Sequence, residues 1–177
     1  MRSSLLPTLA LCLAICACTS IPNIYAPPVQ RKPFEIHDTG PVRHFLAMND
    51  PAAAAHLVAD VSQTLEAGSW RWTGQRPTFR FRLPAGKKLR FVMDFTIAEM
   101  TFQKTGPVTI TFLVNGRQLD RVRYDSHGEK HFEKPVDPDW IRGGEENRAT
   151  AELDKIWVAP DDGAKLGLIL TRVGFLD

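Results

Sequence analysis

A regular alternation of apolar and polar residues runs through the middle of the chain and limits the fold more than any other feature. Between residues 89 and 97 every second side chain is large and apolar, and most residues between them are polar. Residues 78–83 and 108–114 repeat this pattern. A period of two places the apolar side chains on one face of an extended strand, whereas a helix would need a period near 3.6. The sequence therefore predicts half-buried strands packed against a core.

Turn-forming residues separate these segments, and the strand pattern continues toward the C-terminus. Asn115-Gly116 is the strongest hairpin signal, because a type I′ turn needs a positive φ at both central residues. No repeating strand–helix–strand pattern is visible, so we predict an all-β fold, an antiparallel β-sandwich of the jelly-roll type. Further strands are expected at residues 58–65, 119–124, 130–134, 148–158 and 165–175.

The first eighteen residues differ from the rest of the chain. Arg2 precedes a mostly apolar run at residues 5–17, which is shorter than the ~20 residues of a spanning helix and has the length of a secretory signal. The run ends Ile15-Cys16-Ala17-Cys18, which resembles the lipobox of bacterial lipoproteins. This resemblance implies a signal peptide at residues 1–17 and a lipid on Cys18. A plain signal peptide cut before Cys18 is the alternative.

The remaining sequence around the predicted cleavage site bears on location. All three cysteines lie within the first eighteen residues, so the body of the protein must fold without a disulfide. Thr19 follows the cysteine where an Asp would favour inner-membrane retention, and this resembles the outer-membrane sorting pattern of Gram-negative lipoproteins. We therefore expect a lipid-anchored protein of the cell envelope, held at the outer membrane and facing the periplasm.

The chain divides into four parts on composition. After the signal peptide, residues 18–36 carry four prolines and are predicted to form an extended tether. Residues 37–57 are predicted to be a linker with one short helix, because Asn49-Asp50-Pro51 before an alanine run is a typical helix start. Residues 58–177 remain for a single sandwich domain. Lys and Arg number 22 against 20 Asp and Glu, a net charge of +2 that argues against nucleic-acid binding.

Several turn and strand motifs together resemble those of galactose-binding-like β-sandwiches, which occur as carbohydrate-binding modules and as accessory domains of bacterial envelope proteins. The motifs are Gly68-Ser69-Trp70-Arg71-Trp72-Thr73, Val114-Asn115-Gly116, Gly128 before an alternating strand, Asp161-Asp162-Gly163 and Leu166-Gly167. The resemblance covers residues 58–175. It implies a non-catalytic sandwich that binds a ligand or a protein through its loops or one concave face, and it assigns no individual sugar-contacting residue.

Tryptophans are the first candidates for ligand contact. Trp70 and Trp72 are two residues apart, so on a strand they share a face and would form a platform for sugar rings or close one end of the core, and we expect core packing. Trp157 lies in an apolar segment and is expected in the core. Trp140 follows Asp137-Pro138-Asp139 in a predicted turn and is the better candidate for exposure.

Arginines on two successive predicted strands form the second candidate group. Arg80, Arg82 and Arg90 lie on polar faces. If the two strands paired directly, Arg82 would lie near Arg90, which is unfavourable unless an anion lies between them. The alternatives are that the two strands belong to different sheets, or that an acidic glycan or phosphate binds there. A solvated polar face is the simpler expectation.

Two sets of residues have metal-binding side chains, although no cofactor is expected. His127, Glu129, His131 and Glu133 alternate along one predicted strand, but successive side chains on one strand face are ~6–7 Å apart and do not close a zinc shell. The weak candidates for a structural calcium are Asp137, Asp139, Asp161 and Asp162, which turn and capping roles explain equally well.

Catalytic motifs are absent from the sequence. There is no Ser flanked by glycines in a nucleophile elbow, no His-Glu-x-x-His and no phosphate-binding glycine loop. A dispersed pair of carboxylates for glycan hydrolysis is the remaining enzymatic hypothesis. We therefore predict a membrane-anchored lipoprotein with a non-catalytic domain that recognises envelope glycan, with docking to another envelope protein as the alternative.

Overall fold

The computed structural model describes residues 44–177. The predicted signal peptide, Cys18 and the Pro-rich tether lie outside the described residues, so these expectations stay predictions. No helix within the described part is long and apolar enough to cross a membrane. The two helices found there are short, α1 (Ala53–His56) at the predicted position and α2 (Glu99–Thr105), which the sequence analysis did not predict.

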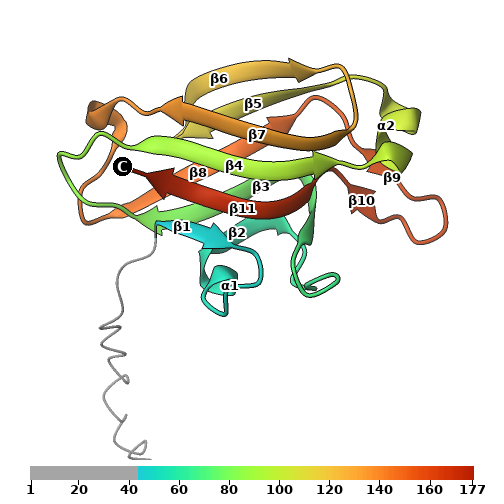
Figure 1. Ribbon diagram of the computed structural model, residues 1–177, viewed down its shortest axis with the longest axis horizontal. Coiled ribbons are helices and arrows are strands. Elements are labelled where there is room, and N and C mark those ends of the chain that lie inside the picture. Colours follow the sequence, from blue (N-terminus) through green and yellow to red (C-terminus); the bar gives the residue numbers. More distant parts are fainter. Residues whose placement is uncertain (1–43) are drawn as a thin grey trace, which may run out of the picture. The chain divides into compact units, whose positions relative to one another are not determined.

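The fold is an antiparallel β-sandwich, which confirms the predicted class (Figure 1). One layer, called sheet A, contains β1 (Phe45–Ala47), β11 (Ile169–Leu176), β4 (Arg90–Ile97) and β7 (Gly128–Pro135) in that order. The other, called sheet B, contains β2 (Leu57–Val61), β3 (Arg71–Arg82), β8 (Glu146–Leu153), β5 (Val108–Val114) and β6 (Arg117–Tyr124).

The two layers are joined at one corner. There the first residues of β11 pair with Arg71 and Trp72 at the start of β3, so the hydrogen bonding continues from one sheet into the other. Next to this corner, β9 (Trp157–Val158) and β10 (Lys165–Leu166) form a small separate hairpin. A 3₁₀ turn, η1 (Pro138–Trp140), follows β7.

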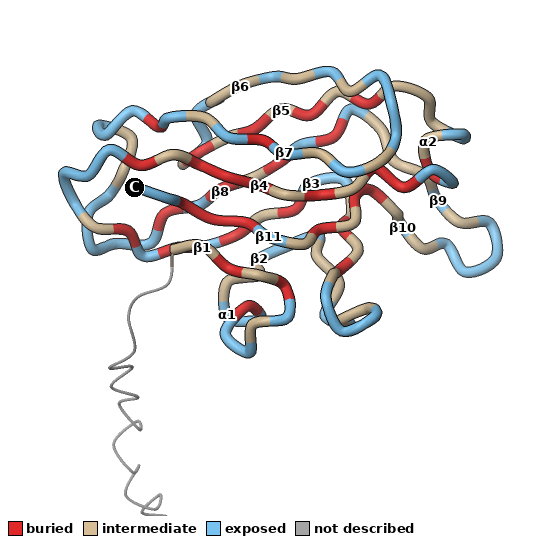
Figure 2. The backbone as a smooth tube through the Cα atoms, in the orientation of Figure 1, coloured by how far each residue is buried: buried red, intermediate tan, exposed pale blue. Residues whose placement is uncertain are grey.

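The alternating apolar residues face inward and form one core between the layers, as predicted (Figure 2). Aromatic rings meet across it. Phe112 of β5 stacks on Phe132 of β7 with ring centres 3.6 Å apart, and Phe91 of β4 contacts both. The opposite, outward side chains of the same strands are mostly polar and exposed, so each sheet presents one polar outer face.

The predicted Asn115-Gly116 hairpin is confirmed. Asn115 has a φ of 50° and Gly116 a φ of 79°, and Val114 pairs with Arg117 at the base of the turn. Two residues with positive φ match the twist of the flanking strands β5 and β6.

Strand β1 extends the sandwich further toward the N-terminus than the expected start at residue 58. Its Leu46 and the following Met48 are both only 1% exposed and belong to the core. The close approach of β1 to β11 depends on Gly174, where a Cβ atom would lie 2.0 Å from the carbonyl oxygen of His44. A three-residue strand is too short to show alternation, which explains why residues 37–57 were expected to be a linker.

An ion pair bridges the two layers at the side opposite this strand. Lys134 Nζ on β7 donates to Asp120 Oδ2 on β6 over 2.6 Å, and these are the outermost strands of their sheets. The hydrogen bond from Lys134 lowers the pKa of Asp120. Beneath it, Tyr124 packs edge-on against Phe95, and burial raises the pKa of its hydroxyl to about 12.

Candidate functional site

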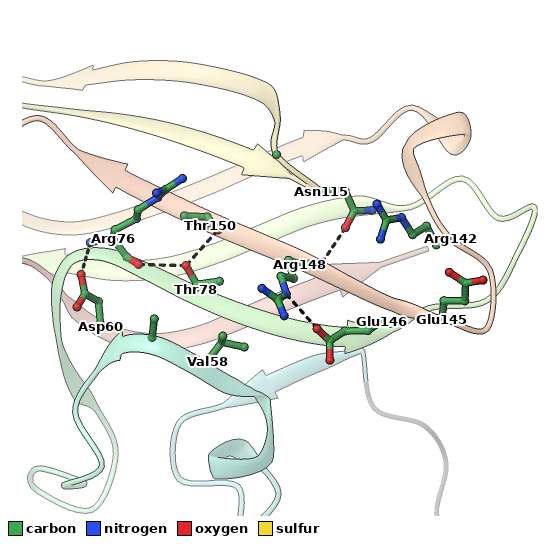
Figure 3. A pocket seen from close by; sticks show the side chains of 12 residues that line it. Val58, Asp60, Arg76, Thr78, Asn115, Arg142, Glu145, Glu146, Arg148 and Thr150 are labelled. Atoms are coloured by element: carbon green, nitrogen blue, oxygen red, sulfur yellow. Dashed lines mark hydrogen bonds and ion pairs between the residues drawn. The ribbon is translucent and has the colours of Figure 1, made fainter.

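A hollow of about 770 Å³ lies over the outer face of sheet B (Figure 3). Its floor is formed by outward side chains of β3 and β8, which pair antiparallel. Thr78 faces Thr150, and their hydroxyl oxygens are 3.2 Å apart. Arg76 and Arg148 extend this floor on either side. The period of two that buries Phe79 and Ala149 thereby turns these polar side chains toward solvent.

We call this depression over β3 and β8 the sheet B hollow. Two walls border it. Strand β2 contributes Val58, Ala59 and Asp60 on one side. On the other side are the Asn115-Gly116 turn and the segment that leads into β8 (Figure 3). That segment supplies Arg142 and Glu145, and Glu146, the first residue of β8, completes the lining.

The buried side chain of Asn147, 0% exposed, holds the second wall together. Its Oδ1 accepts hydrogen bonds from the Asn115 side chain and from the backbone N–H of Arg142, both over 2.8 Å. Its Nδ2 donates to the carbonyl oxygens of Arg142 and Glu145. All the hydrogen-bonding capacity of one amide is therefore used to pin the β5–β6 turn to the neighbouring loop.

Asn115 completes this network from the turn itself. Its Nδ2 also donates to the carbonyl oxygen of Trp140, and its Oδ1 accepts from the backbone N–H of Arg148. A fully satisfied polar network fixes the geometry of the groups around it. The wall of the hollow is accordingly preorganised although it is built from a turn and a loop.

The charges of the sheet B hollow balance. Among the described residues that line it, three are arginines and three are carboxylates, namely Arg76, Arg142, Arg148, Asp60, Glu145 and Glu146. Arg148 Nε pairs with Glu146 Oε1 over 3.0 Å, and both side chains remain about half exposed or more. Within the described part of the chain, the guanidinium of Arg142 has no ion-pair partner. The hollow therefore presents donors and acceptors side by side without a net charge.

The predicted arginine group is not one patch. Arg80 and Arg82 lie on β3 in sheet B and Arg90 lies on β4 in sheet A, so the alternative that places the two strands in different sheets is confirmed. Arg80 lies opposite Arg148 on the paired strand, but the two guanidinium groups have different partners. Arg80 donates to the carbonyl oxygen of Ala55 over 2.7 Å, and Arg148 pairs with Glu146. Arg90 instead forms an ion pair with Glu133.

The tryptophans differ from their expected places. Trp70 and Trp72 do share a face, with ring centres 5.6 Å apart and planes at 88°. Both are half-buried and neither belongs to the core, so the expectation of core packing is wrong. Trp157, expected in the core, is also half-buried outside it. Trp140 is half-buried against the core, with the Arg117 guanidinium 5.7 Å from its ring centre.

Two of the alternating residues, His131 and Glu133 on β7, form ion pairs on the outer face of sheet A, whereas His127 precedes the strand and lies against Phe102. His131 Nδ1 donates to Asp94 Oδ1 over 2.6 Å, and its Nε2 lies 3.3 Å from Glu133. Asp94 also accepts from Arg172 Nε over 2.8 Å. These bonds, chiefly that to Asp94, raise the pKa of His131. Both ring nitrogens of His131 thus contact carboxylates, and Phe132 points into the core, as the alternation suggested.

The aspartates named for calcium serve turns. Asp137 Oδ1 accepts from the backbone N–H of Asp139, and Asp162 Oδ1 accepts from that of Ala164. Asp161 is exposed beside Asp162 in the turn between β9 and β10. Between residues 44 and 177 no group of three or more His, Cys, Asp or Glu side chains is placed to hold a metal ion.

Sequence reasoning missed most of the sheet B hollow. The alternation in residues 78–83 does show that Thr78 faces outward, but nothing local shows that it lies beside Thr150, 72 residues later in the chain. Asn147 carried no signal at all, because a polar residue on the inner face of a strand breaks the pattern. The Asn-Gly turn was the one local sign of where the second wall would be.

Comparisons with known proteins give distant similarities in fold. No family model and no curated protein matches the sequence. Among solved structures, the native structure of a family 35 carbohydrate-binding module from Clostridium thermocellum is similar with a TM-score of 0.43 and 12% identity, over 71% of this chain and 94% of that chain. An isomalto-dextranase of Arthrobacter globiformis T6, complexed with panose, has a TM-score of 0.32 and 13% identity over 64% of this chain and 17% of that chain.

Proposed function

We propose that the sandwich is a non-catalytic domain that binds a neutral glycan in the sheet B hollow. The observation that carries the proposal is the lining of that hollow, which offers three guanidinium groups and three carboxylates together with two threonine hydroxyls. Sugar hydroxyls both donate and accept, so they need both kinds of partner close together. A phosphate or a polyanion would instead need an excess of positive charge.

The shape and rigidity of the hollow support the same proposal. It is open and polar, and among the described residues that line it none is aromatic, so it is poorly suited to an apolar ligand. Its floor lies on two paired strands, and its second wall is fixed by Asn147. A preorganised set of polar groups loses little entropy when a ligand binds.

The alternative of protein docking has less support. In the part of the chain that the structure describes, the exposed large apolar side chains are those of Val58, Met100, Val158 and Leu176. They belong to four different elements, namely β2, α2, β9 and β11. A docking surface of the expected kind would be a contiguous apolar patch.

A matched pair of variants tests the glycan proposal. Arg148 and Arg123 each pair through Nε with a carboxylate two residues away, and both side chains are 61% exposed, but only Arg148 lines the hollow. Calorimetry against chitin, xylan and galactan oligosaccharides should show binding that Arg148→Met weakens about tenfold or more, because a charged hydrogen bond is lost. Arg123→Met should change it less than twofold. Preference for a polyanionic polysaccharide, or equal effects of both variants, would contradict the proposal.

We further propose that a lipid on Cys18 holds this domain at the outer membrane. Support comes from the apolar run at residues 5–17 and the Ile15-Cys16-Ala17-Cys18 motif that ends it. Cys18→Ser should then abolish labelling with a radioactive fatty acid and release the protein into the periplasm. If the wild type takes up no fatty acid and the Cys18→Ser variant still fractionates with membranes, the lipid anchor is refuted. The glycan proposal does not depend on this result.

A further inference from the structure

A second, smaller hollow of about 380 Å³ lies next to the sheet B hollow at the corner where the layers join. It is lined by residues from the end of β2, the start of β3 and strand β10. Trp72, Lys165 and Asp60 are the members with groups suited to a ligand. Asp60 lines both hollows, so the two meet at its side chain.

Trp72 is held firmly in this second hollow. The ring of Trp70 packs edge-on against it, and the backbone N–H of Ser62 donates to the Trp72 carbonyl over 2.8 Å. On its other side Trp72 pairs with Ile169 of β11. Neither indole contributes to the hydrophobic core, so core packing does not explain why two of these large side chains are placed together here.

Asp60 is held in an unfavourable backbone conformation at the junction. Its φ is +54°, in the left-handed region that is uncommon for residues with a Cβ, although Asp adopts it more readily than most. Its Oδ2 accepts from the backbone N–H of Arg76 over 2.9 Å, and its carboxylate packs on Gly74 so closely that a Cβ there would lie 3.0 Å from Asp60 Cγ. Asp60 lines both hollows, and among the described residues its Oδ1 accepts no hydrogen bond, so this oxygen can accept one from a ligand. Residues kept in strained conformations cluster at functional sites.

We propose that Trp72 forms a stacking subsite that continues the sheet B hollow past Asp60, so that the ligand is an oligosaccharide of at least two rings. One ring would hydrogen-bond in the sheet B hollow, and a following ring would lay its apolar face on the Trp72 indole. Lys165 donates to, and Asp60 accepts from, the hydroxyls at the edge of that second ring. This inference rests on the proposed glycan function and adds the size class of the ligand.

Chain length of the ligand tests the inference directly. Calorimetry would compare sugars of one, two, four and six rings from the chitin, xylan and galactan series. In the wild type the affinity should rise about tenfold or more between one ring and four. Trp72→Val should remove this rise and leave the single-ring affinity within twofold, whereas Trp157→Val, at a half-buried tryptophan outside both hollows, should change neither.

The outcomes separate the subsite from the function. If Trp72→Val folds and binds all lengths as the wild type does, while Arg148→Met loses them all, the subsite is refuted and the glycan function stands. A wild type without length dependence also refutes the subsite, and a wild type that binds no sugar refutes the function. If Trp72→Val does not fold, Lys165→Ala at an exposed position replaces it as the test. A selective loss of affinity for the four-ring sugar would support the subsite, and an unchanged affinity for every length would refute it.

Discussion

The two outer faces of the sandwich carry similar side chains but use them differently. On sheet A, Asp94 bonds to both His131 and Arg172, and Glu133 bonds to both His131 and Arg90, so the charged groups form one closed network across β11, β4 and β7. On sheet B the charged groups border a hollow, and Arg142 has no ionic partner within residues 44–177. The first face joins its charged groups into one network across three strands, whereas the second keeps its charged groups in separate exposed pairs around a hollow.

The difference arises from what stands beside each face. In sheet A the neighbouring strands β11, β4 and β7 have eight residues each, and oppositely charged side chains on them reach one another directly. Sheet B carries β2, the Asn115-Gly116 turn and the loop before β8 as raised walls (Figure 3). Those walls enclose a space above the strands, and the charged groups around it form separate pairs, Arg148 with Glu146 and Arg76 with Glu152, instead of one network. The composition of a face therefore does not show whether it stabilises the fold or binds a ligand, because the surrounding backbone determines whether a hollow forms above its side chains.

Loss of Asn147 should have the largest effect and should damage the binding face alone. Asn147→Leu leaves the Asn115 amide and the backbone groups of Arg142 and Glu145 without partners, which should lower the free energy of unfolding by about 2–4 kcal/mol. Urea denaturation would measure this, with Gln118→Leu on exposed β6 as the control. The folded fraction should also bind glycan more weakly. An undiminished affinity would show that the wall does not contribute to the site.

Loss of Asp94 should affect the stabilising face alone. Asp94→Asn removes the carboxylate charge that both His131 and Arg172 contact, and the Asp94 side chain is only 14% exposed. The free energy of unfolding should fall by about 1–2 kcal/mol. Glycan affinity should stay within twofold of the wild type. A large loss of affinity in a folded Asp94→Asn protein would mean that the two faces are not independent.

The smallest expected effect is a pH dependence on the same face. The pKa of folded His131 is raised above the unfolded value of about 6.5, so its charge stabilises the fold below that pH, and this contribution is lost as the pH rises through the folded value. Because the imidazole is largely exposed, the contribution should be under about 1 kcal/mol. His131→Gln should therefore be less stable than the wild type at about pH 5.5 and equal to it at about pH 9. A difference that grows with pH would have the wrong sign.

The sequence predicted the strands far better than it predicted the site. Alternation located β4 and β5 almost to the residue, because one face of each strand is buried. It also showed that Thr78 lies on the face opposite Phe79 and Phe81. It did not show that β3 pairs with β8, because antiparallel partners distant in the chain leave no local mark.

The tryptophans show the converse limit. Their size and hydrophobicity indicate burial, yet Trp70 and Trp72 lie at a corner where the first residues of β3 pair with β11 rather than facing the core. That corner is a property of the whole topology. Likewise β1 was missed because three residues carry no periodicity, and its place depends on Gly174 at the far end of the chain.

The central claim is that one face of the sandwich binds ligand and the other does not. Backbone amide chemical shifts, followed by NMR while a four-ring oligosaccharide from the best-binding series is added, test it residue by residue. We predict progressive shifts at Arg76, Thr78, Arg148 and Thr150 on β3 and β8, with the amide shifts of Asp94, His131 and Arg172 on sheet A unchanged. Shifts confined to β4, β7 and β11 would contradict it.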